Sequence, residues 1–182
     1  MRLGYFVLAL ALGISMTLAS PIAGEPENTL YLDLKTGRVV IEMRPDLAPV
    51  HVARFKELTR QEFYDGLVFH RVIRGFMAQT GDPDGDGTGG TGVNLPAEFS
   101  EEPHVRGILS TARSSDPDSA DSQFFIMLAP APYLDRKYTV WGRVVRGMEF
   151  VDNIKKGSQM RNGMVTDPDK IVRMQVAADA DK

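Results

Sequence analysis

The chain contains no cysteine among its 182 residues. Disulfides, cysteine nucleophiles, thiolate zinc sites and anchoring through a lipid-modified cysteine are therefore excluded. A folded domain must be held together by packing alone, and a chain of this length can bury enough apolar surface to do so. We expect one domain rather than two.

Histidine is scarce as well, with only His51, His70 and His104. The three are scattered and show no HExxH or comparable ligand spacing, so the sequence predicts no metal site. No GxSxG nucleophile motif occurs either, and nothing supports a hydrolase. We expect no cofactor.

An excess of positive charge is also missing. The formal net charge is −3, and no stripe of lysine and arginine runs along any segment. A nucleic acid would have no electrostatic footprint to bind. Nucleic acid is therefore not an expected partner.

A Gly/Asp-rich loop between residues 81 and 94 contains two superficial motif matches. Residues 85–90 satisfy GxGxxG, but a dinucleotide fingerprint must open a helix, and residues 91–96 do not favour one. Residues 82–87 resemble the start of an EF-hand loop, but its twelfth position is Val93 instead of glutamate. We expect a glycine-rich surface loop.

The N-terminus has the pattern of a secretory signal. Arg2 precedes the uncharged run Tyr5–Leu18, and small residues follow at Ala19 and Ala23. This predicts a signal peptide over residues 1–23 and a mature domain over residues 24–182. The alternative is an uncleaved membrane anchor, because the uncharged stretch is nearly long enough to span a bilayer. Cleavage would leave a chain with no stable membrane insertion.

The rest of the chain is rich in short β-prone runs. A mainly β fold is therefore expected, as a closed or nearly closed antiparallel barrel with helical covers. Helices are predicted over residues 50–60, with Pro49 in the first turn, and over residues 148–156. The predicted strands cover residues 29–34, 38–43, 67–73, 76–80, 107–112, 123–128, 138–145 and 170–176.

Three of these segments carry side chains suited to a surface pocket. Arg71 lies between apolar residues of one strand, where a solvent-facing role is the simplest interpretation. Phe76 and Met77 precede Gln79 on the next strand, and core packing is their ordinary role. Phe124 and Phe125 are adjacent on a third strand and must point to opposite faces, so one can fill the barrel while the other lines a pocket.

Four blocks stand out in order along the chain: Phe69–Gln79, Gly87–Gly90, Gly107–Ser110 and Ser122–Ile126. In this order and spacing they make the chain resemble the cyclophilin-type peptidyl-prolyl cis–trans isomerases. The resemblance extends from about Thr29 to about Val176, and residues 112–120 look more like bacterial members. Together with the leader, it implies an exported, periplasmic protein.

The resemblance implies an eight-stranded antiparallel closed barrel capped by two α-helices, with the site on its outer surface. It implies a catalytic role for Arg71 with Gln79, and a monomer that acts on proline-containing, unfolded or partly folded polypeptides. The implied substrate-binding residues are Phe76, Met77, Ala112, Arg113, Gln123, Phe125, Tyr133, Leu134 and Tyr138.

Two of these positions depart from the commonest family pattern. Tyr133 stands where many members have tryptophan, and it still offers an aromatic wall and a hydroxyl. Tyr138 stands where many members have histidine, and it keeps a flat ring while removing a titratable group.

The implied reaction suits a chain without nucleophile, metal or proton shuttle. Rotation about an Xaa-Pro bond makes and breaks no bond to carbon, and only amide resonance must be lost. Two other functions stay open: a proline-segment-binding chaperone module of the same fold without turnover, and a hollow carrier barrel resembling lipocalins.

Overall fold

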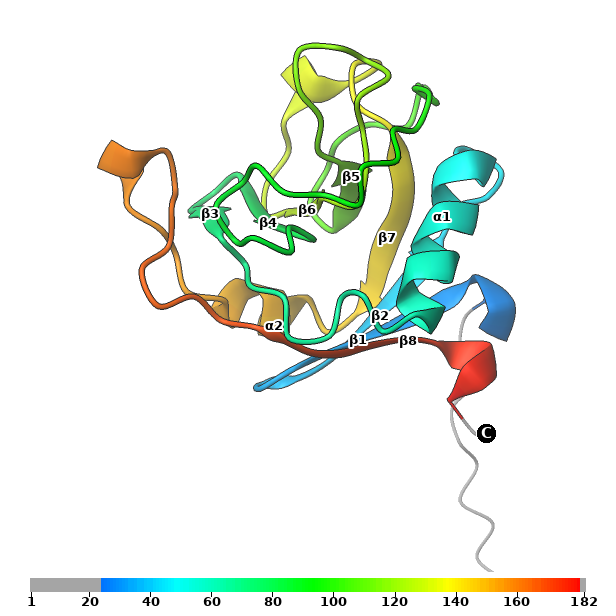
Figure 1. Ribbon diagram of the computed structural model, residues 1–182, viewed down its shortest axis with the longest axis horizontal. Helices are drawn as coiled ribbons and strands as arrows, with labels where there is room; N and C mark the ends of the chain where they lie inside the picture. Colours follow the sequence, from blue (N-terminus) through cyan, green and yellow to red (C-terminus); the bar gives the residue numbers. More distant parts are fainter. Residues whose placement is uncertain (1–23, 181–182) are drawn as a thin grey trace, which may run out of the picture.

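In the computed structural model, which describes residues 24–180, eight antiparallel strands form one strongly curved sheet (Figure 1). The strand order is β3-β4-β6-β5-β7-β2-β1-β8. The proposed signal peptide, residues 1–23, lies outside the described residues. The strands are β1 (Thr29–Leu34), β2 (Gly37–Met43), β3 (Arg71–Ile73), β4 (Met77–Thr80), β5 (Ile108–Thr111), β6 (Phe124–Met127), β7 (Val140–Arg146) and β8 (Ile171–Val176).

The eight strands curl until β3 and β8, the two ends of the sheet, approach each other. The seam between them is made by the chain just before each strand, where Val68 bridges Lys170. The Phe69 N–H donates to the Asp169 carbonyl at 2.9 Å, and the Ile171 N–H donates to the Leu67 carbonyl at 2.9 Å. The predicted antiparallel barrel is confirmed, but the expected strand over residues 67–73 is regular only at its end, because these seam contacts bend its first half.

Two helices cover the sheet, and four short 3-10 turns lie before, between or after its strands. Within residues 24–180 no helix is long and apolar enough to span a bilayer. The second helix ends earlier than predicted, because Ile154 leaves the helical conformation and is buried in the core. The helices are α1 (Pro49–Arg60) and α2 (Met148–Asn153), and the turns are η1 (Pro26–Asn28), η2 (Pro132–Leu134), η3 (Gln159–Arg161) and η4 (Ala177–Asp179).

Helix α1 is started by proline and capped from a distant loop. Pro49 occupies the first turn, where its missing N–H costs nothing. The preceding Ala48 has no side chain that could cap the helix, and the Glu98 carboxylate accepts the N–H groups of Val50 and His51 instead, each at 3.0 Å. The anion at the helix N-terminus offsets the unpaired donors there.

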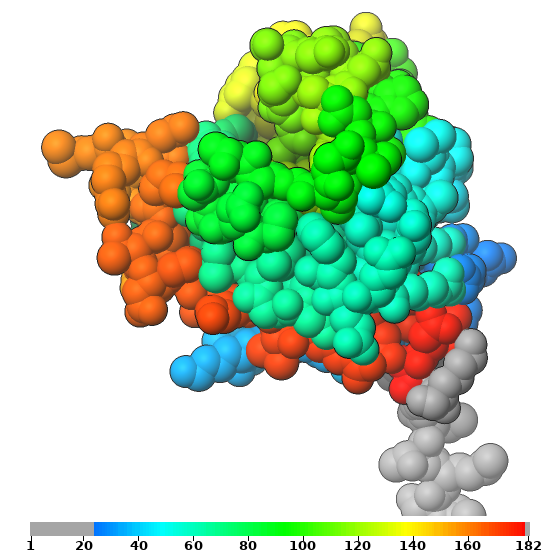
Figure 2. All heavy atoms as spheres, in the orientation of Figure 1, coloured from blue at the N-terminus to red at the C-terminus, as the bar shows by residue number. Residues whose placement is uncertain are grey.

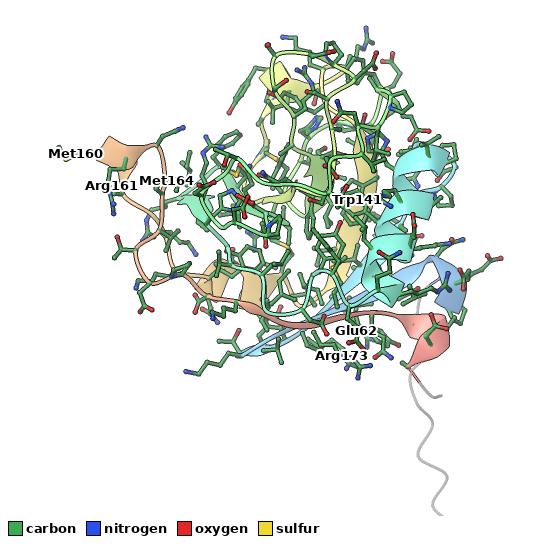
Figure 3. The ribbon with its side chains drawn as sticks, viewed as in Figure 1. Glu62, Trp141, Met160, Arg161, Met164 and Arg173 are labelled. Carbon is green, nitrogen blue, oxygen red and sulfur yellow. The ribbon has the colours of Figure 1, made fainter. Side chains whose placement is uncertain are left out.

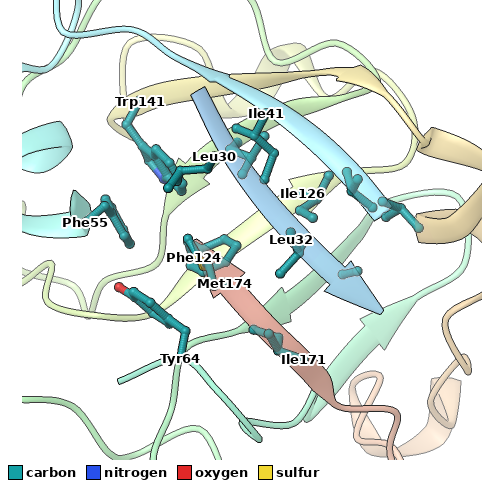
Figure 4. Packing of buried hydrophobic residues seen from close by; sticks show 14 of the residues in the cluster. Leu30, Leu32, Ile41, Phe55, Tyr64, Phe124, Ile126, Trp141, Ile171 and Met174 are labelled. Atoms are coloured by element: carbon teal, nitrogen blue, oxygen red, sulfur yellow. The ribbon is translucent and has the colours of Figure 1, made fainter. Parts of the chain in front are cut away.

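Side chains fill the barrel. Trp141 is fully buried and stacks on Phe55, with ring centroids 4.1 Å apart, while Phe124 meets it edge-on at 5.4 Å (Figure 4). Leu30 and Ile126 pack beside these rings in the same cluster. The interior is therefore a packed core, as in small barrels, and leaves no room for a carrier's ligand.

The three histidines make the fold sensitive to acid. Burial lowers the pKa of His51, His70 and His104, although Glu98, Asp82 and Asp135 respectively oppose the shift. The unfolded chain therefore binds protons more readily than the folded chain below pH about 6.5. Stability is fully present above that pH and falls as the pH decreases, by up to about 1.4 kcal/mol per pH unit for each histidine.

Urea unfolding between pH 7.5 and 5.5 tests this prediction, because most carboxylates titrate at lower pH. The variant His70→Leu should show a shallower pH slope, because it removes one of the three groups whose pKa burial lowers. Equal stability at both pH values would contradict the prediction.

Candidate active site

A pocket of about 350 Å³ opens on the outside of the barrel, over β3, β4 and β6. Ten of the eleven residues that the sequence assigned to the site line it: Arg71, Phe76, Met77, Gln79, Ala112, Arg113, Phe125, Tyr133, Leu134 and Tyr138. The eleventh, Gln123, lines a neighbouring glycine-rich hollow of about 390 Å³, which also includes Gly87. Gln79, Ala112 and Arg113 line both cavities and form the ridge between them.

The apolar wall of the pocket is separate from the barrel core. Met77, Phe125 and Leu134 belong to a second buried cluster, whereas Phe124 lies in the first. The alternation along β6 thus sends one aromatic ring inward and the other into the pocket. This wall offers a flat, largely dry surface to a small apolar ring.

Two tyrosine rings, those of Tyr133 and Tyr138, complete the rim of the pocket. Tyr133 is 60% exposed and lies against Phe76, with centroids 5.9 Å apart. Tyr138 meets Phe125 edge-on, also at 5.9 Å. Each tyrosine therefore supplies the aromatic surface that the sequence predicted for it.

The guanidinium of Arg71 lines the same pocket and is held by three hydrogen bonds. Strand pairing places Arg71 opposite Gln79, and its Nη1 donates to the Gln79 Oε1 at 3.1 Å. Its Nε donates to the Asn162 carbonyl at 2.9 Å, and its Nη2 donates to the Asn162 Oδ1 at 3.1 Å. Burial lowers the pKa of Arg71, but an arginine side chain stays charged.

Asn162 is a site residue that sequence reasoning missed. It lies on an arm, residues 157–165, that projects from the body beside β3 (Figure 2, orange). Backbone hydrogen bonds from Gly157 to Val72 and from Val72 to Gly163 dock the arm along the edge of β3. The Asn162-Gly163 pair marks a turn in the sequence, but no local pattern indicates that this turn reaches Arg71.

The tight fit of the arm depends on Gly163. Its φ is 82°, and a Cβ there would lie only 2.4 Å from the Ile73 Cγ1. Asn162 itself has a left-handed φ of 49°, a conformation that asparagine tolerates. The turn therefore presents both the carbonyl and the side chain of Asn162 to the guanidinium.

We expect Asn162→Gly to lower kcat about fivefold with little change in KM, because it removes one hydrogen bond that orients the Arg71 guanidinium. Glycine accepts the left-handed backbone, so the arm should keep its shape. Single-turnover isomerisation kinetics and a thermal unfolding curve would measure both effects.

Two further variants control this prediction. Asn162→Asp retains the acceptor oxygen and should retain activity. Met160→Ala alters a fully exposed side chain at the outer end of the same arm and should change nothing (Figure 3). Loss of activity in Met160→Ala, or a raised KM in Asn162→Gly, would contradict a positioning role.

A chain of amides connects Arg71 to the glycine-rich loop. The Gln79 Nε2 donates to the Gln123 Oε1 at 2.9 Å, and the Gln123 Nε2 donates to the carbonyls of Gly87 and Gly89 at 3.2 and 2.8 Å. This chain fixes the orientation of both amide groups. Gln123 therefore holds the loop and Gln79 in place from outside the main pocket.

The loop itself offers no metal centre. Among residues 24–180 no group of three or more histidine, aspartate or glutamate side chains is arranged to hold a metal ion. The buried Asp82 carboxylate instead accepts N–H groups from Asp84, Asp86 and Gly87 and shapes the turn. Backbone geometry thus explains the buried Asp82.

Comparison with known proteins agrees with this geometry. The family model described as "Cyclophilin type peptidyl-prolyl cis-trans isomerase/CLD" matches residues 29–176. A probable peptidyl-prolyl cis-trans isomerase of Brucella suis biovar 1 is 52% identical over 184 residues, covering 94% of this chain and 92% of the relative. Peptidyl-prolyl cis-trans isomerase B of Bacillus subtilis is 43% identical over 137 residues, covering 74% and 95% respectively.

Solved structures give the same result. Cyclophilin AquaCyp293 from Hirschia baltica has a TM-score of 0.76 at 28% identity, covering 86% of this chain and 76% of its own. A Cryptosporidium parvum cyclophilin crystallised in the presence of the dipeptide Ala-Pro has a TM-score of 0.74 at 28% identity, covering 81% and 98%. The chain belongs to the cyclophilin-type peptidyl-prolyl cis–trans isomerases.

Proposed function

We propose that this isomerase accelerates Xaa-Pro rotation by using Arg71 to favour the loss of amide resonance, and that its substrates are exported polypeptides still folding. The observation that carries the mechanism is the position of the Arg71 guanidinium, which lines the same cavity as Phe125 and Leu134. The charged donor and the apolar wall that can hold a proline ring therefore line the same pocket.

The chemistry requires a donor that acts only when the bond is twisted. The barrier to rotation is about 18–20 kcal/mol, and in the twisted state a lone pair forms on the prolyl nitrogen. Of the five N–H groups of Arg71, three are used by Asn162 and Gln79, which leaves two for that nitrogen. Because planar imide nitrogen accepts poorly, this hydrogen bond stabilises mainly the transition state and raises kcat.

The apolar wall supplies positioning. Held against Phe125, Met77 and Leu134, a pyrrolidine ring would keep one side of the bond still while the preceding carbonyl swings. The crystallisation of the Cryptosporidium relative with Ala-Pro supports a proline-containing peptide as the ligand class.

The isomerase activity can be tested by NMR exchange spectroscopy on an Ala-Pro peptide, with protein that consists of residues 24–182. We expect cis–trans exchange to be accelerated at substoichiometric protein concentration. Acceleration of proline-limited refolding of a model protein would separate an enzyme from a module that only binds proline segments. Binding without acceleration would overturn the proposed function.

The rate should stay nearly constant from about pH 6.5 to pH 9, because no step needs a titrating acid or base. A kcat/KM profile at constant ionic strength measures this. A bell-shaped profile would indicate a missed acid–base pair and contradict the mechanism.

We further propose that the chain is exported to a bacterial periplasm, that residues 1–23 are removed on the way, and that the mature protein is a monomer without membrane insertion. The leader pattern of Arg2 and the uncharged run after it supports export. Fractionation of cells that express the full chain, with mass spectrometry of the product, tests it. Full-length protein in the cytoplasm or in the membrane fraction would overturn this proposal.

A further inference from the structure

The pocket that Arg71, Phe125 and Leu134 line is called the proline pocket below. It is positively charged, although the protein as a whole is negative. Its lining includes Arg71 and Arg113 and contains no aspartate or glutamate. The formal charge of the whole chain is −3. A local excess of two positive charges in a concave site raises the local concentration of anionic groups.

More than half of the arginines in residues 24–180 are neutralised by carboxylates, whereas the two that line the pocket are not. Seven arginines of residues 24–180 form ion pairs with carboxylates: Arg38, Arg44, Arg54, Arg60, Arg106, Arg136 and Arg143. Arg71 and Arg113 bind only carbonyl and amide oxygens. Their full charges are therefore available to a ligand.

Arg113 is fixed in place rather than free. Its Nη1 donates to the Ser114 carbonyl at 2.8 Å, and its Nη2 donates to the Lys137 carbonyl at 2.7 Å. Its guanidinium lies over the Tyr138 ring, 4.6 Å from the centroid. A pre-oriented cation of this kind loses little conformational entropy when it meets a carboxylate.

Arg113 also lies where the substrate must pass. It lines both the proline pocket and the glycine-rich hollow, together with Gln79 and Ala112. A polypeptide whose proline occupies the pocket crosses this ridge as it leaves toward the hollow. The hollow has one carboxylate, Asp121, which is already engaged by Thr91 and Gly92.

We propose that Arg113 is a specificity-determining residue that favours substrates with a carboxylate one or two positions before the proline. The inference rests on the proposed function and names its substrate class: acidic segments such as Glu-Pro and Glu-Ala-Pro. A lysine at the same positions meets two uncompensated guanidinium groups and is disfavoured.

Exchange spectroscopy on capped peptides with Glu, Gln or Lys at each of the two positions tests this, because it reports kcat/KM without a coupling protease. The expected ratio of kcat/KM for Glu over Lys is about fivefold at low salt, the size of a surface charge pair. It should approach one in 1 M salt, where the screening length is about 3 Å. A ratio near one at low salt overturns the inference.

Variants assign the preference to Arg113. Arg113→Gln should reduce it to the part that Arg71 supplies, Arg113→Glu should invert it, and Arg113→Lys should retain it. Arg136→Gln is the matched control, since Arg136 is paired with Glu101 and lines neither cavity, and it should keep the wild-type ratio. A ratio that is unchanged in both Arg113→Gln and Arg113→Glu overturns the assignment.

The two proposals fail differently. If wild-type protein does not accelerate even an Ala-Pro peptide, the proposed function is wrong. If it accelerates Ala-Pro but treats Glu and Lys peptides alike, only the specificity inference is wrong. Should a variant at position 113 not fold, the salt dependence of the wild-type ratio still decides whether charge selects the substrate.

Discussion

Arg71→Ala is expected to lower kcat/KM about 10²- to 10³-fold, the loss typical of removing one donor aimed at a transition-state charge. Of the two arginines that line the pocket, alanine removes the one that is hydrogen-bonded to both Gln79 and Asn162. Substrate affinity should change much less than kcat, because the planar ground-state imide gives the guanidinium little to bind. Exchange rates at saturating and limiting peptide concentrations measure the two effects separately.

The barrel should survive this substitution. Arg71 is half-buried and lies outside both apolar clusters, so its loss creates no cavity in the core. Arg71→Lys keeps the charge, but lysine lacks the planar guanidinium that donates to Gln79 and Asn162 at the same time. It should therefore rescue only part of the rate. Arg173→Ala is the control, because Arg173 is an exposed arginine on β8, on another face (Figure 3). Unimpaired turnover by Arg71→Ala would refute the mechanism.

Phe124→Ala is expected to reduce the free energy of unfolding by about 3 to 5 kcal/mol. The Phe124 ring is fully buried and touches Phe55, Tyr64 and Trp141 edge-on, so truncation leaves a cavity between rigid rings. Without a disulfide to limit the unfolded state, such a loss is a large share of a typical domain's total stability. Urea unfolding followed by the fluorescence of the single tryptophan measures it.

Phe76→Ala provides the contrast. Phe76 is only partly buried and packs against the exposed Tyr133 at the pocket rim. Its truncation should raise KM while costing much less stability, because water can fill the space. If Phe76→Ala destabilised the protein as much as Phe124→Ala and left KM unchanged, the division between core and pocket would be wrong.

Local sequence patterns predicted most of the framework correctly. Strands β1 and β2 were expected from their β-prone runs, and they pair as an antiparallel hairpin. The opposite roles of Phe124 and Phe125 followed from strand alternation alone. Both predictions concern residues close together in the chain, which is why strand patterns of period two could make them.

Irregular segments were harder to predict. Residues 67–70 have a strand-like composition, yet they form seam contacts with residues 169–171 instead of a ladder. Helix α2 was expected to reach Lys156 but stops at Asn153. In both places contacts with distant segments override local propensity, which is worth less than burial and hydrogen bonding of the same residues.

The sequence by itself determined a cysteine-free, mainly β barrel and the residues that line its pocket, because strand alternation and the family's blocks are written along the chain. Only the tertiary structure decided that Asn162, 91 positions after Arg71, holds the guanidinium, and that Arg113 stands unneutralised between two cavities. Both depend on loops meeting across the surface. How the barrel closes determines which surface loops come into contact, and no periodicity in the chain encodes these contacts.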